Sequence, residues 1–200
     1  MARRAYEGIE SVLPSTNRYY GMRHGTSRAM EQGIIVSSLE AGTDPEYGLT
    51  EGGRDEVEAS IDRSDLSSDT LIIASPFSRA FESAVLAEQR LGARAVRCAL
   101  ELGERFFGEL DGKSTDNYKS VWERDRRDST AEYMGVEPAD LVAVRGLQLI
   151  KQLDEEYGGA TILLVSHGDT LQILEAVRRG QPAGHHRGLF PLAPGEIRRI

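Results

Sequence analysis

Cysteine is nearly absent from the sequence: Cys98 is the single one in 200 residues. One cysteine cannot form an internal disulfide, so the small secreted scaffolds that depend on several disulfides are excluded. Cys98 lies in an apolar stretch. We therefore expect a buried, unreactive thiol at this position.

Long hydrophobic runs are also missing. No apolar run approaches the roughly 18 residues that a membrane-spanning helix needs. The first residues, Met1 to Glu7, are charged and no apolar stretch follows them. We therefore expect no secretory signal, no membrane association and a cytoplasmic location.

Basic residues do not predominate, because 24 Lys and Arg face 32 Asp and Glu, for a formal net charge of -8. A general nucleic-acid or anionic-membrane surface usually needs a basic face. The charge therefore argues against a nucleic-acid or membrane partner. Any anion that this protein binds must be held by a local cluster of residues.

Apolar strand-like and helix-like segments alternate along the chain, which is typical of an α/β fold. The length suits one domain over 1–200, with a mostly parallel central sheet and helices on both faces. We expect an N-terminal arm at 1–16 and strands at 17–22, 70–74, 94–99, 161–165 and 196–200. Helices are expected at 51–66, with Thr50 as the N-cap, and at 78–91, 137–157 and 169–178. A loop is expected at 180–188.

The segment at about 111–137 does not fit this alternation, since it is polar with scattered aromatics such as Tyr118, Trp122 and Tyr133. We expect an inserted helical cap over the site. Its run 123–128 mixes charges of both signs and predicts a solvated helix face.

Two His-Gly pairs each follow a predicted buried strand. Arg23-His24-Gly25 comes after the strand at 17–22, and His167-Gly168 comes after the strand at 161–165. Ligands of open α/β sheets bind beyond the carboxyl ends of the strands. If these two strands are neighbours, both imidazoles lie in one site.

Five ordered motifs resemble the histidine phosphatase superfamily, also called the phosphoglycerate mutase-like family. Together they span nearly the whole chain and fall at suitable ends of the predicted strands and helices. They are Arg23-His24-Gly25-Thr26-Ser27, Tyr47-Gly48-Leu49-Thr50-Glu51-Gly52-Gly53-Arg54, Ser75-Pro76-Phe77-Ser78-Arg79-Ala80, Leu102-Gly103-Glu104-Arg105-Phe106-Phe107-Gly108 and Ser166-His167-Gly168-Asp169.

The resemblance implies that His24 attacks phosphorus and becomes phosphohistidine, which water then hydrolyses. A nucleophilic histidine must be neutral, and two nearby guanidinium groups disfavour its protonation. By the same resemblance Arg23, Arg79 and His167 bind the phosphoryl oxygens. The expected phosphate site is completed by weaker contacts from Thr26, Ser27 and Gly168.

Glu104 matches the general acid of that family, which protonates the leaving alcohol and later takes a proton from water. This role requires a raised pKa. Phe106 and Phe107 are expected to raise the pKa of Glu104 by desolvation, and Arg105 is expected to lower it. Considered singly, Arg23, Arg79 and Glu104 are equally compatible with ordinary ion pairs. One anion site explains the ordered set together.

No metal or other cofactor is expected. His185-His186 has no Cys, Asp or Glu at ligand spacing, so we expect this pair in a loop or at the rim of the site. Two positions depart from the family pattern. Met30 and Pro194 stand where many members carry asparagine, which predicts one missing phosphate contact and an altered rim.

The sequence thus predicts a metal-independent phosphomonoesterase acting on a small phosphorylated metabolite or with broad specificity. A mutase is an alternative, although mutases usually carry a longer insertion and an Arg-His-Tyr-Gly word after the acid. A phosphate or phosphopeptide binding module without turnover is a second alternative, against which the presence of both His24 and Glu104 argues. The alcohol part of the substrate and the oligomeric state stay open.

Overall fold

The structure is a computed structural model that describes residues 15–200. The predicted N-terminal arm lies outside the described residues except for Ser15 and Thr16. Within the described part of the chain, no helix is long and apolar enough to cross a membrane.

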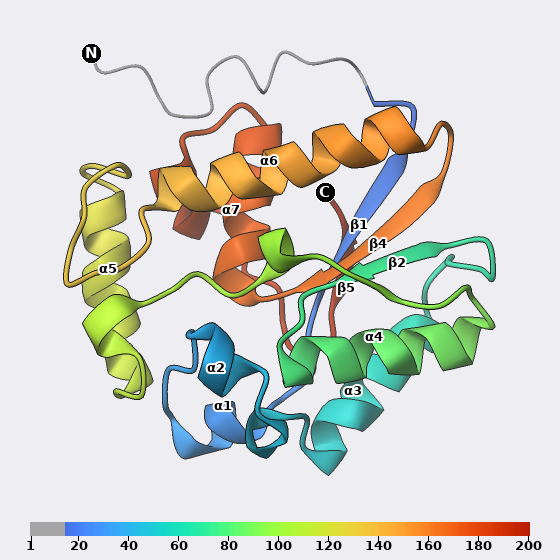
Figure 1. Cartoon of the computed structure of the whole chain (residues 1–200), viewed down its shortest axis with the longest axis horizontal. Helices are drawn as coiled ribbons and strands as arrows, with labels where there is room; N and C mark the ends of the chain where they lie inside the picture. Colours follow the sequence, from blue (N-terminus) through green and yellow to red (C-terminus); the bar gives the residue numbers. More distant parts are fainter. Residues whose placement is uncertain (1–14) are drawn as a thin grey trace.

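A five-stranded sheet forms the centre of the molecule (Figure 1). Its order is β3-β2-β4-β1-β5, and every neighbouring pair is parallel except β1 with β5. The strands are β1 (Arg18–Arg23), β2 (Leu71–Ala74), β3 (Arg97–Cys98), β4 (Thr161–Ser166) and β5 (Ile197–Arg199).

Helices cover both faces of this sheet, with α3 and α4 on one side and α6 and α7 on the other (Figure 1). The α-helices are α1 (Arg28–Gln32), α2 (Leu39–Gly42), α3 (Glu51–Asp62), α4 (Ser78–Leu91), α5 (Tyr118–Asp125), α6 (Ala139–Glu156) and α7 (Gly168–Arg178). Short 3-10 helices are η1 (Pro45–Tyr47), η2 (Leu100–Leu102), η3 (Gly108–Leu110), η4 (Thr115–Asn117) and η5 (Ala183–Gly188).

The apolar residues of β4 alternate between two cores, because successive side chains of a strand point to opposite faces. Ile162 and Leu164 pack with α6 and α7, and Leu163 and Val165 pack with α3 and α4. All four side chains are fully buried. Burial on both faces makes β4 a central strand and holds the residues that follow it in a fixed position.

A third, smaller core lies under the segment predicted to be a cap. Ile35, Phe107, Leu110, Val121 and Val136 form it. This core joins α5 and the turn after it to the loop at 103–111. The cap is thereby packed on the chain that carries Glu104.

The structure confirms the mixed α/β class and the mostly parallel sheet. Thr50 caps α3 as predicted, its side chain accepting from Gly53 N, but the helix ends at Asp62 rather than near Leu66. The β-rich stretch 94–99 forms only the two-residue β3, and the expected loop 180–188 contains η5. Pro138 is the N-cap of α6 and not a residue of its first turn.

One prediction about burial is wrong, and a second holds at every position but one. Cys98 is exposed, because β3 lies at the edge of the sheet. Within the run 123–128, Asp125 is 6% exposed, because its carboxylate forms a bidentate ion pair with buried Arg105. That run is therefore not a wholly solvated face.

The loop after β1 and the first turn of α3 approach each other at two glycines. A Cβ on Gly25 would lie 2.1 Å from the Gly53 carbonyl oxygen, and a Cβ on Gly53 would lie 2.0 Å from the Thr26 carbonyl oxygen. The same Thr26 carbonyl accepts from the backbone N–H of Thr50 at 3.0 Å. The absence of side chains at both glycines thus fixes where the residues after β1 lie.

We expect the substitution Gly53→Ala to lower the free energy of unfolding by about 1–3 kcal/mol, since overpacking against backbone cannot relax by a rotamer change. Gly52→Ala is the matched control, because a Cβ there meets nothing within 4 Å. In the same helix this control should be neutral or more stable by up to about 1 kcal/mol. Urea unfolding measures both, and equal midpoints for the two variants would contradict the close approach.

Candidate active site

The parallel pairing of β1 with β4 brings the two His-Gly pairs together. Arg23 is in register with Ser166, so His24 and His167 leave the sheet side by side. Their ring centroids lie 5.1 Å apart in an edge-on arrangement. The geometric expectation drawn from the two strand ends therefore holds for this chain.

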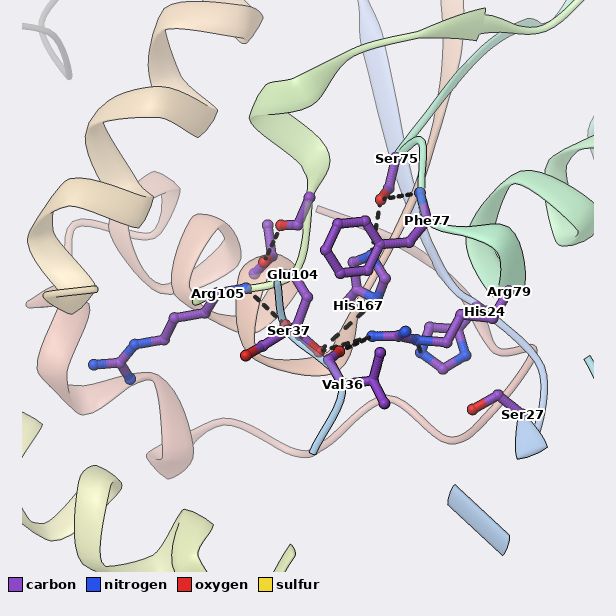
Figure 2. Close-up of polar contacts among 12 residues, drawn as sticks. His24, Ser27, Val36, Ser37, Ser75, Phe77, Arg79, Glu104, Arg105 and His167 are labelled. Carbon is purple, nitrogen blue, oxygen red and sulfur yellow. Dashed lines mark hydrogen bonds and ion pairs between the residues drawn. The ribbon is translucent and has the colours of Figure 1, made fainter. Parts of the chain in front are cut away.

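His24 is buried, and both ring nitrogens are engaged. Nδ1 lies 2.7 Å from the carbonyl oxygen of Gly25, and Nε2 accepts from Nε of Arg79 at 3.1 Å (Figure 2). A carbonyl only accepts, so Nδ1 carries the proton and Nε2 keeps a lone pair. Burial, and then the charges of Arg79 and Arg23, holds the pKa of His24 well below its usual value. The ring is therefore neutral.

Arg79 is the second residue of α4, which begins directly after the loop that follows β2. The side chain is 5% exposed. Nη2 donates to the carbonyl oxygen of Val36 at 2.9 Å, which fixes the plane of the guanidinium beside His24. Nη1 is buried and has no hydrogen-bond partner among residues 15–200.

Arg23 ends β1 and is held by the last loop of the chain. Its Nη1 donates to the carbonyl oxygen of Leu192 at 2.9 Å. Nε is buried without a partner in the described part of the chain. The backbone N–H of Gly195 donates to the carbonyls of both Arg23 and His24. Pro194-Gly195 therefore closes this rim through the backbone.

His167 contributes a further unpaired nitrogen. Its Nε2 lies 2.9 Å from the hydroxyl oxygen of Ser75, which already accepts from the backbone N–H of Phe77. A proton donated by Ser75 to Nε2 leaves the ring proton on Nδ1. Nδ1 is buried and, within 15–200, makes no hydrogen bond. Burial, followed by the charge of Arg79, holds the pKa of His167 well below its usual value.

Among residues 15–200, three buried N–H groups from three segments thus lack acceptors: Nε of Arg23, Nη1 of Arg79 and Nδ1 of His167. Leaving a buried donor unsatisfied costs about 1–3 kcal/mol each, so such groups call for an explanation. All three residues lie around His24. Donors of this kind are the groups by which proteins bind oxyanions.

Glu104 faces this group from the loop after η2. Its Oε2 lies 3.8 Å from Nδ1 of His167 and 4.0 Å from Nη2 of Arg79. Burial, with a smaller contribution from the carboxylate of Asp169, raises the pKa of Glu104 to about 7. Arg79, the backbone N–H of Arg105 and Arg23 act in the opposite direction. A carboxyl with this pKa exchanges protons near neutrality.

Arg105 lowers the pKa of Glu104 as expected, and it does so through its backbone and not through its side chain. The Arg105 side chain extends away from Glu104 (Figure 2), and its guanidinium pairs with Asp125 at 2.6 and 2.7 Å and with Asp169 at 3.5 Å. Its backbone N–H, which donates to Glu104 Oε1 at 3.0 Å, is what lowers the pKa. Of the two expected desolvating rings, Phe107 is fully buried and Phe106 is 42% exposed.

A cavity of about 300 Å³ opens onto His24, Arg23, Arg79 and Glu104. Ser27 and Gly168 also line it, whereas Thr26 does not. The hydroxyl of Thr26 instead donates to Glu56 at 3.0 Å. Six of the eight predicted site residues thus line this cavity, whereas His167 packs against His24 without lining it and Thr26 is directed elsewhere.

The sequence reasoning did not assign several lining residues. Met30, noted only as a departure, lies on one wall, and Tyr118 stacks on Trp122 at 5.3 Å on another. Asp169 ends the motif Ser166-His167-Gly168-Asp169, whereas Arg187 belongs to none of the five motifs. The residues without an assigned role are Ala29, Met30, Ile34, Val36, Thr115, Tyr118, Trp122, Asp169, Arg187 and Pro191.

The two adjacent histidines have different surroundings. His185 is exposed, and His186 is fully buried with Nε2 3.5 Å from Asp169, so the expectation that both lie in a loop or at the rim is wrong for His186. Across residues 15–200, no three His, Cys, Asp or Glu side chains are grouped as metal ligands would be.

Solved structures with the same fold include two complexes of a mycobacterial glucosyl-3-phosphoglycerate phosphatase. The VO3 complex is 25% identical with a TM-score of 0.73, and the alignment covers 90% of this chain and 88% of that chain. The complex with inorganic phosphate is 26% identical with a TM-score of 0.70, over 90% and 87%. The alpha-ribazole phosphatase from Shigella flexneri is 26% identical with a TM-score of 0.72, over 90% and 88%.

Among curated protein sequences, none matches this chain. The family model of the histidine phosphatase superfamily, branch 1, matches residues 19–200. That span runs from β1 to the last residue and contains every motif on which the resemblance was based. The chain therefore belongs to the histidine phosphatase superfamily.

Proposed function

We propose that this protein is a metal-independent phosphomonoesterase that acts through a phosphohistidine at His24. The observation that carries the proposal is the set of three unpaired, buried N–H groups around a neutral imidazole. Related phosphatases that share the fold bind VO3 and inorganic phosphate. Both ligands are small oxyanions of the kind that these donors fit.

In the first step, Nε2 of His24 attacks phosphorus, a P–N bond forms and the P–O ester bond breaks. In the free protein, the N–H at Nε of Arg79 donates to Nε2 of His24. When the ester binds, this N–H donates to a phosphoryl oxygen instead, and Nε2 becomes free to attack. Positive charge that develops on the imidazole reaches Nδ1–H, where the Gly25 carbonyl stabilises it. Arg23, Arg79 and His167 offset the negative charge on the phosphoryl oxygens.

Glu104 donates its proton to the leaving oxygen in this step, so that a neutral alcohol departs. In the second step, its carboxylate takes a proton from water, whose oxygen attacks phosphorus as the P–N bond breaks. Phosphate is released, and His24 and Glu104 return to their initial protonation states. A pKa near neutrality suits both directions of this exchange.

Arginines rather than a metal ion supply the positive charge in this proposal. The described residues hold no grouped metal ligands near the phosphate donors, and the guanidinium fork matches phosphoryl geometry. We propose small phosphorylated metabolites as substrates, since the cavity of about 300 Å³ admits a compact alcohol group.

The substitution His24→Ala should lower kcat on para-nitrophenyl phosphate by about 10³-fold or more, since the nucleophile is removed. Rapid quench of the wild type at alkaline pH, followed by mass spectrometry, should find one phosphoryl group on His24. Near-UV circular dichroism serves as the fold control for the variant.

Turnover that survives His24→Ala in a folded protein would refute the phosphohistidine route. Turnover that a chelator abolishes and an added divalent ion restores would refute the metal-independent proposal. Phosphate or vanadate binding without turnover of any ester in a broad panel would favour the non-catalytic binding module. Phosphate exchange between phosphoglycerates that depends on a bisphosphorylated primer would favour the mutase.

We further expect kcat/KM on phenyl phosphate to fall as the pH rises through about 7, because Glu104 must be protonated to act as the acid. Glu104→Gln should abolish this decrease of kcat/KM above pH 7 and should lower kcat/KM by about 10²-fold or more. The loss should be smaller with para-nitrophenyl phosphate, whose leaving group needs less protonation. Glu109→Gln, an exposed neighbour in the same loop, is the matched control. Equal losses on both esters would refute the acid role.

A further inference from the structure

A second cavity of about 270 Å³ adjoins the catalytic cavity and shares two lining residues with it, Trp122 and Arg187. The remaining lining residues come from the end of α5 and from the segment around η5. They are Arg126, Gln181, Gly184, His185 and Gly188. The catalytic machinery derived above uses none of these residues.

Arg187 stands between the two cavities and is held in place. Its guanidinium carbon lies 3.9 Å from the ring centroid of Trp122, and Nη1 donates to Oε1 of buried Gln172 on α7. Trp122 is fixed in turn, because its Nε1 donates to the Asp169 carboxylate at 2.9 and 3.0 Å. Such a preorganised cation loses little conformational entropy when it binds an anion.

The second cavity is lined by positive charge, while the carboxylate of Asp169 acts on Arg187 from the catalytic cavity. No carboxylate lines the second cavity, and within residues 15–200 neither Arg126 nor Arg187 forms an ion pair. Asp169, which lines the catalytic cavity, is already engaged by Trp122 and Arg105. In a chain of net charge -8, two arginines left together beside a cavity without a carboxylate indicate an anion site.

Apolar and aromatic residues contribute to the lining of the catalytic cavity that contains both the phosphate donors and Arg187. Met30 and Val36 lie among the apolar lining residues, and the stacked Tyr118 and Trp122 form a flat wall. A substrate that carries a compact group on an apolar or planar spacer suits this lining.

We propose that the substrate carries a second anionic group, a carboxylate or a phosphate, which Arg187 binds while His24 receives the phosphoryl group. Arg126 and His185 lie beyond Arg187 and extend the site for the larger of these groups. The inference rests on the proposed phosphomonoesterase function and adds the class of substrate: phosphate esters of anionic alcohols. Arg187 acts in specificity and takes no part in the bond-making steps.

The test compares aryl phosphates that differ only in charge at the ring substituent. The series carries a carboxylate, a phosphonate or an uncharged carboxamide at the meta or para position. The wild type should prefer at least one anionic member over its carboxamide by about tenfold or more in kcat/KM, as a charge-assisted hydrogen bond implies. The carboxylate and phosphonate arms distinguish the two kinds of anionic group.

The variants separate the charge of Arg187 from its packing. Arg187→Met keeps the apolar contact with Trp122 and should reduce the preference to about one, whereas Arg187→Lys should retain part of it. Arg127→Gln is the matched control, since Arg127 follows Arg126 but lines neither cavity. This variant should prefer the anionic esters over the carboxamide as strongly as the wild type does.

Two results would overturn the inference: a wild type without preference for any anionic member, or a preference that Arg187→Met leaves unchanged. Either result, obtained while the carboxamide ester is hydrolysed through His24, leaves the phosphomonoesterase proposal standing. Absence of hydrolysis of every ester overturns the phosphomonoesterase proposal itself, together with the substrate class that rests on it.

Discussion

The neutral, buried imidazole of His24 is the constraint on which the rest of the site depends. The Gly25 carbonyl accepts from Nδ1 and so fixes the proton there, and the lone pair of Nε2 accepts from Nε of Arg79. Burying an imidazole next to two guanidinium groups is compatible with folding only if the ring stays uncharged. The same condition makes a nucleophile available at neutral pH. Structural and chemical requirements therefore coincide at this residue.

The unsatisfied donors around His24 have an energetic meaning that complements this constraint. Arg23, Arg79 and His167 are each held by one hydrogen bond to a backbone or side-chain oxygen while another N–H group stays free. The held bonds fix direction, and the free ones retain binding capacity for an anion. Under the proposed function, a site organised in this way needs little rearrangement when a phosphoryl group binds, which is the condition for electrostatic stabilisation of charge in the transition state.

Arg105 connects the catalytic loop to the cap. Its backbone touches Glu104, while its guanidinium pairs with Asp125 at the end of α5 and approaches Asp169 in the first turn of α7. Asp169 also holds Trp122, on which Arg187 stacks. One buried ionic network thus links the position of Glu104, the indole of Trp122 and the guanidinium of Arg187. Removal of one partner would leave an unpaired buried charge, which is strongly destabilising.

Local sequence patterns were enough to predict the α/β class, the strands β1 and β4, the extent of α4 and the residues that gather at the strand ends. These features depend on local apolar patterns and on short motifs at fixed positions. Packing between distant segments, in contrast, exposes Cys98, buries Asp125 and His186, turns the Arg105 side chain away from Glu104 and brings Arg187 to the cavity. Each of these outcomes depends on partners far apart in the chain, because burial and ion pairing of a charged side chain are set by what packs against it and not by its sequence neighbours.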